Sequence, residues 1–403
     1  MLKNILKIEE KKIIFVLLFI IIDTLLLFSF GKSYSKFIIF ESLYLHDLLN
    51  LIVFSLIVLN FINKGSRIKS IEIFSLIALI YLIHSLFLSK NISNSYYIII
   101  RQFMLFGYLI FYYSIVKKIA SNKNALNLLY KFIIIFSKLS VLTQIIYVIY
   151  LFIIKDINPF FERYYYSPIT IFGIIIFSSF VIITFKGYKK WIYFTLTLIL
   201  SLTMGHDSIY LSMLVIFFAY LFITLNTKLK IIAILLSIAT LFFLFYQVPT
   251  FNDANVEWRL YYWQQGLHKI ILENYFTFGE GFGIEYFGET QQNYLNDIMK
   301  KYGHNVVMTE QDRYVIPFHN SFITIMYNIG GIAIILLYYP LVMFRKKLTE
   351  STEKTILFFA LIGLTVFTAF NVILELPHSS SVYWLVYFIL IYKLKNNNIQ
   401  RIL

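Results

Sequence analysis

Apolar segments about 20 residues long recur along almost the whole chain, and short polar stretches separate them. A helix needs roughly 20 mostly apolar residues to cross a bilayer. Only 14% of the residues are charged, whereas soluble domains average about 25%. The sequence therefore predicts an all-α, polytopic integral membrane protein with about twelve transmembrane helices. The expected spans are residues 13–30, 43–62, 71–89, 96–116, 132–154, 168–185, 191–204, 208–225, 231–247, 319–344, 355–376 and 380–395.

Lysine and arginine are divided unevenly between the connections that join these spans. One alternating set is rich in them and includes Lys11 and Lys12, Lys117 and Lys118, and residues 345–347. By the positive-inside rule, both termini then lie in the cytoplasm and the long polar stretch 248–318 lies outside. The same division explains the net charge of +14 without nucleic acid as a partner. The first span lacks a small-residue cleavage site, so we expect a retained anchor.

The polar stretch divides the chain into three parts. Residues 1–247 are expected to form an N-terminal transmembrane bundle of about nine helices. Residues 248–318 form a large external loop with interfacial helices, and residues 319–403 hold the C-terminal spans and a cytoplasmic tail. Within the loop, residues 257–272 have the spacing of an amphipathic helix that lies at the membrane surface. This organisation predicts that the loop lies over a membrane-embedded substrate.

Several polar residues from separate connections share the external side in this topology. Histidine occurs there in company with arginine, whereas the cytoplasmic connections carry lysine and no histidine. This partition predicts a functional site at the external face. The residues concerned are Arg163, His206, Arg259, His268, Arg313, His319 and His378.

His319 is the strongest candidate because it opens a predicted membrane helix. Asn320 or Ser321 can cap that helix. Free N–H groups and the positive helix end favour a nearby anion and disfavour an imidazolium, so a neutral histidine that accepts a proton is expected. The alternative is an interfacial histidine that only caps or hydrogen-bonds.

The arginine candidates have two interpretations each. Arg259 and Arg163 suit bidentate contact with phosphate, or they extend to lipid headgroups. Arg101 lies inside the fourth span near its outer end, where a charge is costly and therefore a functional candidate, although it too can extend to the surface. Asp23 and Lys138 lie deeper in their spans, and we assign them no role.

Other chemistries find little support in the sequence. Cysteine is absent, which excludes disulfides and thiolate chemistry. No histidine and carboxylate set has metal-ligand spacing, so no metal or other cofactor is expected. The glycine-rich run at 278–283 predicts a tight turn, because no strand precedes it. His206 and Asp207 form an oriented imidazole or a polar turn. Trp263 and other loop aromatics suit stacking on sugar rings or anchoring at the interface.

The loop resembles the O-antigen polymerase and O-antigen ligase superfamily (Wzy and WaaL). The resemblance rests on an ordered set of motifs between Arg259 and Gly331, and elsewhere it extends to topology alone. The motifs are Glu257-Trp-Arg259-Leu, Trp263, Asn274, the Gly279-x-Gly281-x-Gly283 turn, His319-Asn320 and Gly330-Gly331.

The resemblance implies a metal-independent glycosyltransferase of the broad GT-C type in the bacterial inner membrane. Such enzymes use glycans carried on undecaprenyl diphosphate. It assigns diphosphate binding to Arg259 and makes His319 a general base or a group that positions the acceptor. Weaker assignments as substrate-binding residues go to Arg163, Arg101, Asn320, Trp263, Arg313, His206 and His378. Membrane lipid is an expected partner, and a chain-length regulator protein is a further one that the resemblance allows.

Two departures from the family pattern bear on this assignment. The family often has a Ser-Arg pair after the seventh span, where this chain has Gly205-His206-Asp207-Ser208, so Arg101 or Arg163 would have to serve instead. Ala333 stands where ligases tend to have Gly, Thr or Tyr, which favours a polymerase. A ligase that transfers the chain to lipid A core is the alternative. A precursor transporter is another, and it predicts charges along a path through the bilayer.

Overall fold

The computed structural model describes residues 2–40, 43–58, 67–88, 96–160, 164–205, 207–225, 229, 254–272, 276–301 and 307–396. These residues are almost entirely helical, which confirms the all-α prediction. A short antiparallel pair, β1 (Ile38–Phe40) and β2 (Leu43–Tyr44), precedes α3. The helices are α1 (Leu2–Phe30), α2 (Lys32–Ser35), α3 (Leu45–Val58), α4 (Lys69–Leu88), α5 (Tyr96–Ala120), α6 (Lys123–Ile154), α7 (Pro168–Thr184), α8 (Gly187–Thr203), α9 (Asp207–Thr224), α11 (Ala254–Leu272), α12 (Glu289–Lys301), α13 (Asp312–Val315), α14 (Ser321–Ile329), α15 (Ile332–Met343), α16 (Thr352–Ala369) and α17 (Pro377–Asn396), with the 3-10 helix η2 (Arg345–Lys347) after α15.

Five of these helices are long and apolar enough to cross a membrane: α1 from Glu10 onward, α4, α5, α6 and α16. Helices α3, α7, α9 and α15 are also apolar but shorter. The expected ninth span, residues 231–247, lies outside the described residues. Length and composition therefore support a membrane protein, while the expected total of about twelve spans stays a prediction.

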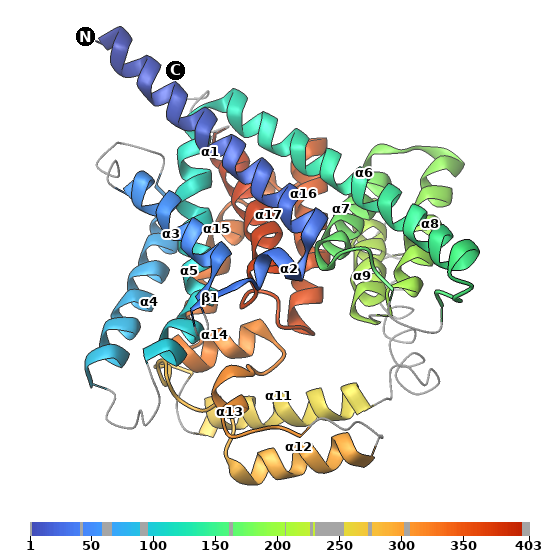
Figure 1. The fold of residues 1–403 in the computed structure, drawn as a ribbon. Helices are drawn as coiled ribbons and strands as arrows, with labels where there is room; N and C mark the ends of the chain where they lie inside the picture. The colour runs from blue at the N-terminus through green and yellow to red at the C-terminus, as the bar shows by residue number, and fades with distance from the viewer. Residues whose placement is uncertain are drawn as a thin grey trace.

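Helix α17 forms the centre of the bundle (Figure 1). Its side chains from Val382 to Tyr392 are fully buried, and the helix packs on α5, α7 and α16. Helices α1 and α6 lie outside this core, against α5 and α7. A helix that faces protein on every side takes its packing from neighbouring helices, and large aromatic side chains such as those of α17 supply much of the contact area.

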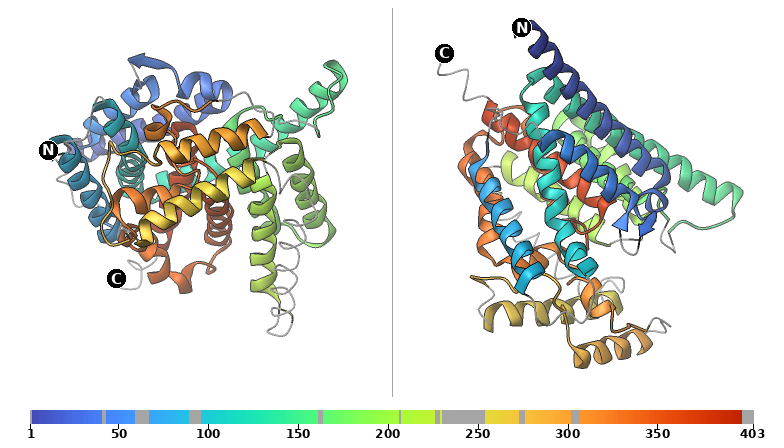
Figure 2. Two further views of the ribbon diagram at one scale, coloured as in Figure 1. Left: turned by 90° about the horizontal axis from the view of Figure 1, so that it is seen from below. Right: turned by 60° about the vertical axis from the view of Figure 1, so that its left-hand side comes forward.

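The helices α11 and α12 cross the end of the bundle opposite to the N-terminus (Figure 1). Viewed from below, they lie side by side beneath the bundle (Figure 2). Helix α11 contains the amphipathic helix expected at residues 257–272 and packs on α14. The predicted external loop therefore forms a folded layer over one end of the bundle, and α14 joins this layer to the bundle.

The expected tenth span, residues 319–344, is not one helix. It is divided at Gly330 and Gly331 into α14 and α15, and Gly330 has a φ of +89°. The N–H of Glu280 donates to the Tyr327 carbonyl (2.7 Å), and the N–H of Gly281 donates to the Asn328 carbonyl (2.9 Å). The segment 278–283, for which a tight turn is predicted, bends at Phe278, Phe282 and Gly283, and it satisfies carbonyl groups that the break in the helix leaves free.

The eleventh expected span also ends earlier than its sequence limit of residue 376. Helix α16 ends at Ala369, and the connection to α17 runs over residues 370–376. The Nδ2 group of Asn371 bonds the Phe367 carbonyl (2.9 Å) and Ser208 Oγ (2.8 Å), so this connection is tied to the start of α9. Glu375 consequently lies between α16 and α17, outside the candidate membrane spans, and contacts the start of α14.

Candidate functional site

An aromatic cluster fixes the approach to α14. Trp258 and Tyr262 of α11 are buried together with Phe318 and Tyr286. The Tyr262 hydroxyl donates to the Ile316 carbonyl at 2.5 Å. Buried aromatic residues with a satisfied hydroxyl hold a segment firmly. The chain from 316 to 320 is thus held between α11 and the start of α14.

His319 has an unusual backbone conformation at this point. Its φ is +50°, which is uncommon for a residue other than glycine. Asn320 is the residue that caps α14: its Oδ1 accepts from the N–H groups of Phe322 (3.0 Å) and Ile323 (3.2 Å). The capping prediction is confirmed for Asn320. Because Asn320 caps α14, the imidazole of His319 does not serve as the cap.

The surroundings of His319 keep its imidazole neutral. Its ring lies 4.3 Å from the ring of Trp258, at an interplanar angle of 80°. Burial, and then the charge of Arg259, lower the pKa of His319 to about 3. A neutral imidazole accepts hydrogen bonds, but it binds a proton only weakly at this pKa. The packing of α11 on α14 thus brings together the two residues that the sequence predicts to be catalytic.

Glu375 is a functional candidate that the sequence analysis missed. Its Oε2 atom accepts a 2.6 Å hydrogen bond from Ser321 Oγ, two residues after His319. The same Oγ accepts from the N–H groups of Ile373 and Leu374, both at 3.2 Å. Oε1 of Glu375 is closed off from solvent and has no hydrogen-bond partner among the residues that the structure describes. The carboxyl group is thus fixed through one oxygen, while the other is buried and accepts no hydrogen bond from the described residues.

Burial raises the pKa of Glu375 to about 7, although the hydrogen bond from Ser321 and the charge of Arg101 act in the opposite direction. A carboxyl group with this pKa exchanges its proton readily near neutral pH. Perturbed carboxyl groups of this kind concentrate at functional sites. The pKa of Glu375 is therefore closer to neutral pH than that of His319.

Arg101 is a half-buried residue of α5. Its guanidinium carbon is 4.8 Å from the centre of the Tyr44 ring. Nη1 is buried without a hydrogen-bond partner in the described part of the chain. The positive charge of Arg101 lowers the pKa of Glu375 and the pKa of Tyr286. An unpaired buried N–H of this kind suits an anionic or hydroxyl-rich ligand.

The remaining predicted residues have other contacts. The guanidinium of Arg313 pairs with Glu285 (3.5 Å) and Glu310 (3.4 Å). The Trp263 ring packs 5.2 Å from that of Phe370. His378 is buried, and its Nδ1 lies 3.0 Å from Ser35 Oγ. Substrate binding by these residues stays a prediction.

Arg163 and His206 are outside the described residues. Their predicted roles in substrate binding therefore stay predictions. The neighbouring Ser208 Oγ accepts from Asn371 of the 370–376 connection. The start of α9 is thus joined to the connection that carries Glu375.

A second buried polar cluster lies between α1, α2 and α3. Asp23, which the sequence left without a role, accepts a 2.9 Å hydrogen bond from the Tyr34 hydroxyl and lies 3.2 Å from His46 Nε2. On α3, Asp47 accepts a 2.6 Å hydrogen bond from Tyr108 of α5. These contacts satisfy charges inside the bundle and explain why they are tolerated there. The Lys138 ammonium lies 4.9 Å from the centre of the Phe180 ring.

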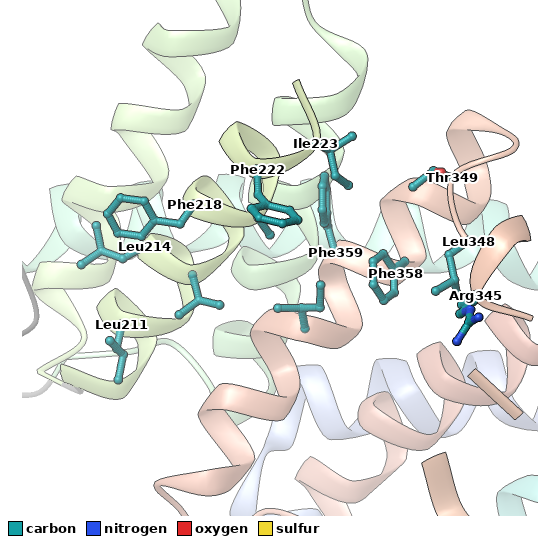
Figure 3. A pocket seen from close by; sticks show the side chains of 13 residues that line it. Leu211, Leu214, Phe218, Phe222, Ile223, Arg345, Leu348, Thr349, Phe358 and Phe359 are labelled. Atoms are coloured by element: carbon teal, nitrogen blue, oxygen red, sulfur yellow. The ribbon is translucent and has the colours of Figure 1, made fainter. Parts of the chain in front are cut away.

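A cavity of 580 Å³ lies elsewhere, between α9, α16 and the turn after α15 (Figure 3). Its walls are apolar side chains such as Phe218 and Phe359, and Arg345 and Thr349 lie on one side of it. None of its lining residues belongs to α11, α14 or the 370–376 connection. This cavity is therefore separate from the candidate site.

Within the described ranges, no group of three or more histidine and carboxylate side chains is placed to hold a metal ion. Comparison with known proteins adds no assignment. No protein-family model matches the chain, and neither curated proteins nor solved structures show significant similarity to it. The functional argument therefore rests on the geometry around α14.

Proposed function

We propose that the protein is a metal-independent membrane glycosyltransferase. It would polymerise oligosaccharide repeat units linked to undecaprenyl diphosphate into O-antigen or a related surface polysaccharide. The observation that carries this proposal is the pairing of a neutral histidine, His319, with the cation Arg259 beside the start of α14. Hydroxyl recognition and anion stabilisation are the two requirements of glycosyl transfer from a diphosphate.

The proposed reaction joins two lipid-linked units. A hydroxyl oxygen of the acceptor sugar attacks the anomeric carbon of the donor chain, and a new glycosidic bond forms. The bond between that carbon and the diphosphate oxygen breaks, and the oxygen keeps the electron pair. Arg259 stabilises the charge on the leaving diphosphate. His319, neutral beside Arg259, accepts a hydrogen bond from the attacking hydroxyl and orients it.

The membrane arrangement belongs to the same proposal. About twelve spans of a GT-C-like bundle, with both termini in the cytoplasm, would place the layer of α11 and α12 outside the inner membrane. The five long apolar helices are consistent with this arrangement. The donor lipid would then lie in the outer leaflet, and its diphosphate would reach the level of Arg259. A chain-length regulator protein remains a proposed partner.

Two other functions would use parts of the same geometry. A ligase would transfer the finished chain to lipid A core, so it differs in acceptor alone. A transporter for the lipid-linked unit requires charged groups along a path through the bilayer. The charges of Asp23 and His46 are instead paired with each other between α1 and α3. This pairing favours the enzyme.

The proposal is tested with the purified full-length chain in lipid vesicles and synthetic undecaprenyl-diphosphate-linked repeat units. The wild type should give products of two or more units, and His319→Ala and Arg259→Ala should each lower the rate by about 100-fold or more. His84→Ala is the matched control, because His84 is exposed on α4. Transfer to lipid A core alone would indicate the ligase. Movement of the substrate across the vesicle membrane without a new glycosidic bond would indicate the transporter.

A further inference from the structure

We propose that Glu375 is the group that removes the proton from the attacking hydroxyl, and that His319 positions this hydroxyl. The inference rests on the proposed function and names a further residue of its site. It follows from three features of the structure: the fixed position of the carboxyl group, its buried oxygen that accepts no hydrogen bond from the described residues, and the charges around it.

The position of the carboxyl group is fixed by the start of α14. Ser321 Oγ donates to Oε2 (2.6 Å) and accepts from two N–H groups of the connection that carries Glu375. Because Ser321 is the first residue of α14, the carboxyl group of Glu375 is held against a residue that follows His319 by two positions. A proton acceptor must be held within hydrogen-bond reach of its substrate, and this network restricts the carboxyl group to one place.

The second oxygen, Oε1, accepts no hydrogen bond in the described part of the chain. It is buried, and the Thr324 hydroxyl and the N–H of Glu375 itself lie near the carboxyl group without donating to this oxygen. A buried carboxylate oxygen without a partner is costly, so such atoms call for a functional explanation. A sugar hydroxyl supplies the donor that this atom lacks.

The groups that face Glu375 come from several elements. Ser321 and Thr324 of α14 are close enough to hydrogen-bond to it, and Arg101 of α5 is the cation that acts on it. Tyr286, from the segment before α12, is a further titratable neighbour, because the carboxylate raises its pKa. Burial outweighs these partners and raises the pKa of Glu375 to about 7. The carboxyl group is therefore partly ionised at neutral pH and can accept a proton.

His319 is less suited to this step. Its pKa of about 3 makes the imidazole a weak proton acceptor near neutral pH. General-base catalysis is most effective when the pKa of the base is close to the working pH, and Glu375 meets this condition. In the proposed step the hydroxyl proton passes to Oε1 of Glu375, and the hydroxyl oxygen bonds to the anomeric carbon. The bond from that carbon to the diphosphate breaks, and its electron pair leaves with the diphosphate. The protonated carboxyl group returns the proton to water before the next cycle.

The deciding experiment measures transfer by the full-length chain in vesicles between pH 5 and 9, with the synthetic lipid-linked units as substrate. The wild-type rate should rise with pH through about 7, since ionised Glu375 is required. Glu375→Gln should lower kcat by about 100-fold or more, with little change in KM, and should abolish this dependence. Glu375→Asp should keep a pH-dependent fraction of the activity. Wild-type kcat and pH profile in Glu375→Gln would overturn the inference and leave the proposed function intact, whereas absence of transfer by the wild type would overturn both.

Two further measurements separate a proton acceptor from a structural residue. Ser321→Ala keeps the carboxyl group but removes a bond that lowers its pKa and helps to fix its position, so the midpoint of the pH profile should move to higher pH and the maximal rate should fall without being lost. Infrared difference spectra between pH 5.5 and 8.5 should show deprotonation of a buried carboxyl group in the wild type and not in Glu375→Gln. Glu375 that remains ionised throughout this range would overturn the inference without reference to activity.

Discussion

The ring of Trp258 lies 4.3 Å from the ring of His319 at an angle of 80°, so the indole of α11 directly supports the imidazole that precedes α14. Arg259, the next residue of α11, supplies the positive charge that acts on the same imidazole. Two successive residues of α11 therefore act on the packing and the protonation of His319. Under the proposed function, activity should depend on the position of α11 on α14.

Replacement of Trp258 should consequently show how far glycosyl transfer depends on the aromatic ring packed against His319. Trp258→Ala removes a buried aromatic side chain, which typically costs about 3–5 kcal/mol, and leaves His319 free to turn. We expect glycosyl transfer to fall at least tenfold, because misplaced catalytic groups lose rate steeply. Trp258→Phe keeps an aromatic ring against the imidazole and should retain most of the activity. Both rates are measured in vesicles, and equal activity of the two variants would contradict the supporting role.

The low pKa of His319 predicts a loss of stability in acid. The folded protein binds this proton only near pH 3, whereas an unfolded histidine binds it near pH 6.5. Between these values the unfolded state holds more protons, so stability falls as the pH drops below about 6.5, with a slope of up to about 1.4 kcal/mol per pH unit. His319→Gln should unfold at a temperature that depends less on pH between 7.5 and 5. Thermal unfolding in detergent at the two pH values checks this.

A second variant tests the cause of that shift. Arg259→Gln removes the charge that adds to the effect of burial, so the pKa of His319 should rise and the acid sensitivity should become smaller than in the wild type. If the pH dependence of unfolding were the same in the wild type, His319→Gln and Arg259→Gln, another group would be its source.

The sequence predicted the helical class and the pair of Arg259 and His319, because apolar segment length and an ordered set of motifs are local properties of the chain. The sequence did not predict Glu375 as a candidate, because its environment is formed by Ser321 and Arg101, which are distant from it in sequence. A carboxylate in a short turn looks like a solvated residue until its neighbours are known. The division of the tenth expected span had a visible signal in Gly330-Gly331, but the cause is the approach of the 278–283 turn, which only the fold reveals.

Gly279 should be the most sensitive glycine of that turn. A Cβ atom there would lie 2.2 Å from the backbone nitrogen of Ile329 and 2.3 Å from the Asn328 carbonyl carbon. Backbone atoms cannot move aside as a flexible side chain can, so Gly279→Ala should displace the turn from α14 and lower both stability and transfer. Gly107→Ala is the matched control, since its nearest neighbours would be at 3.7 Å within α5. Comparable unfolding temperatures for the two variants would show that the turn does not restrain α14.

The absence of cysteine gives a direct test of the proposed topology. Phe278 is exposed in the layer expected outside the membrane, and Lys346 is exposed in the turn expected in the cytoplasm. In intact cells, an impermeant maleimide should label Phe278→Cys and leave Lys346→Cys unlabelled until the membrane is opened. Labelling in the reverse order would place the α11 layer in the cytoplasm, where lipid-linked units of the outer leaflet are out of reach.

Arg101 provides the last test, because its charge acts from α5 on Glu375 in the connection between α16 and α17. Removal of the charge in Arg101→Gln should raise the pKa of Glu375 further above its usual range, since burial would then meet less opposition. The pH at which the rate of glycosyl transfer reaches half its maximum should move upward from about 7, and activity at high pH should be partly retained. Arg67→Gln is the control: Arg67 is exposed, pairs with Glu72 at 2.9 Å, and should leave the midpoint unchanged. An unchanged midpoint in Arg101→Gln would mean that Arg101 does not act on the proton acceptor, and its unpaired N–H would then have to be explained by ligand binding alone.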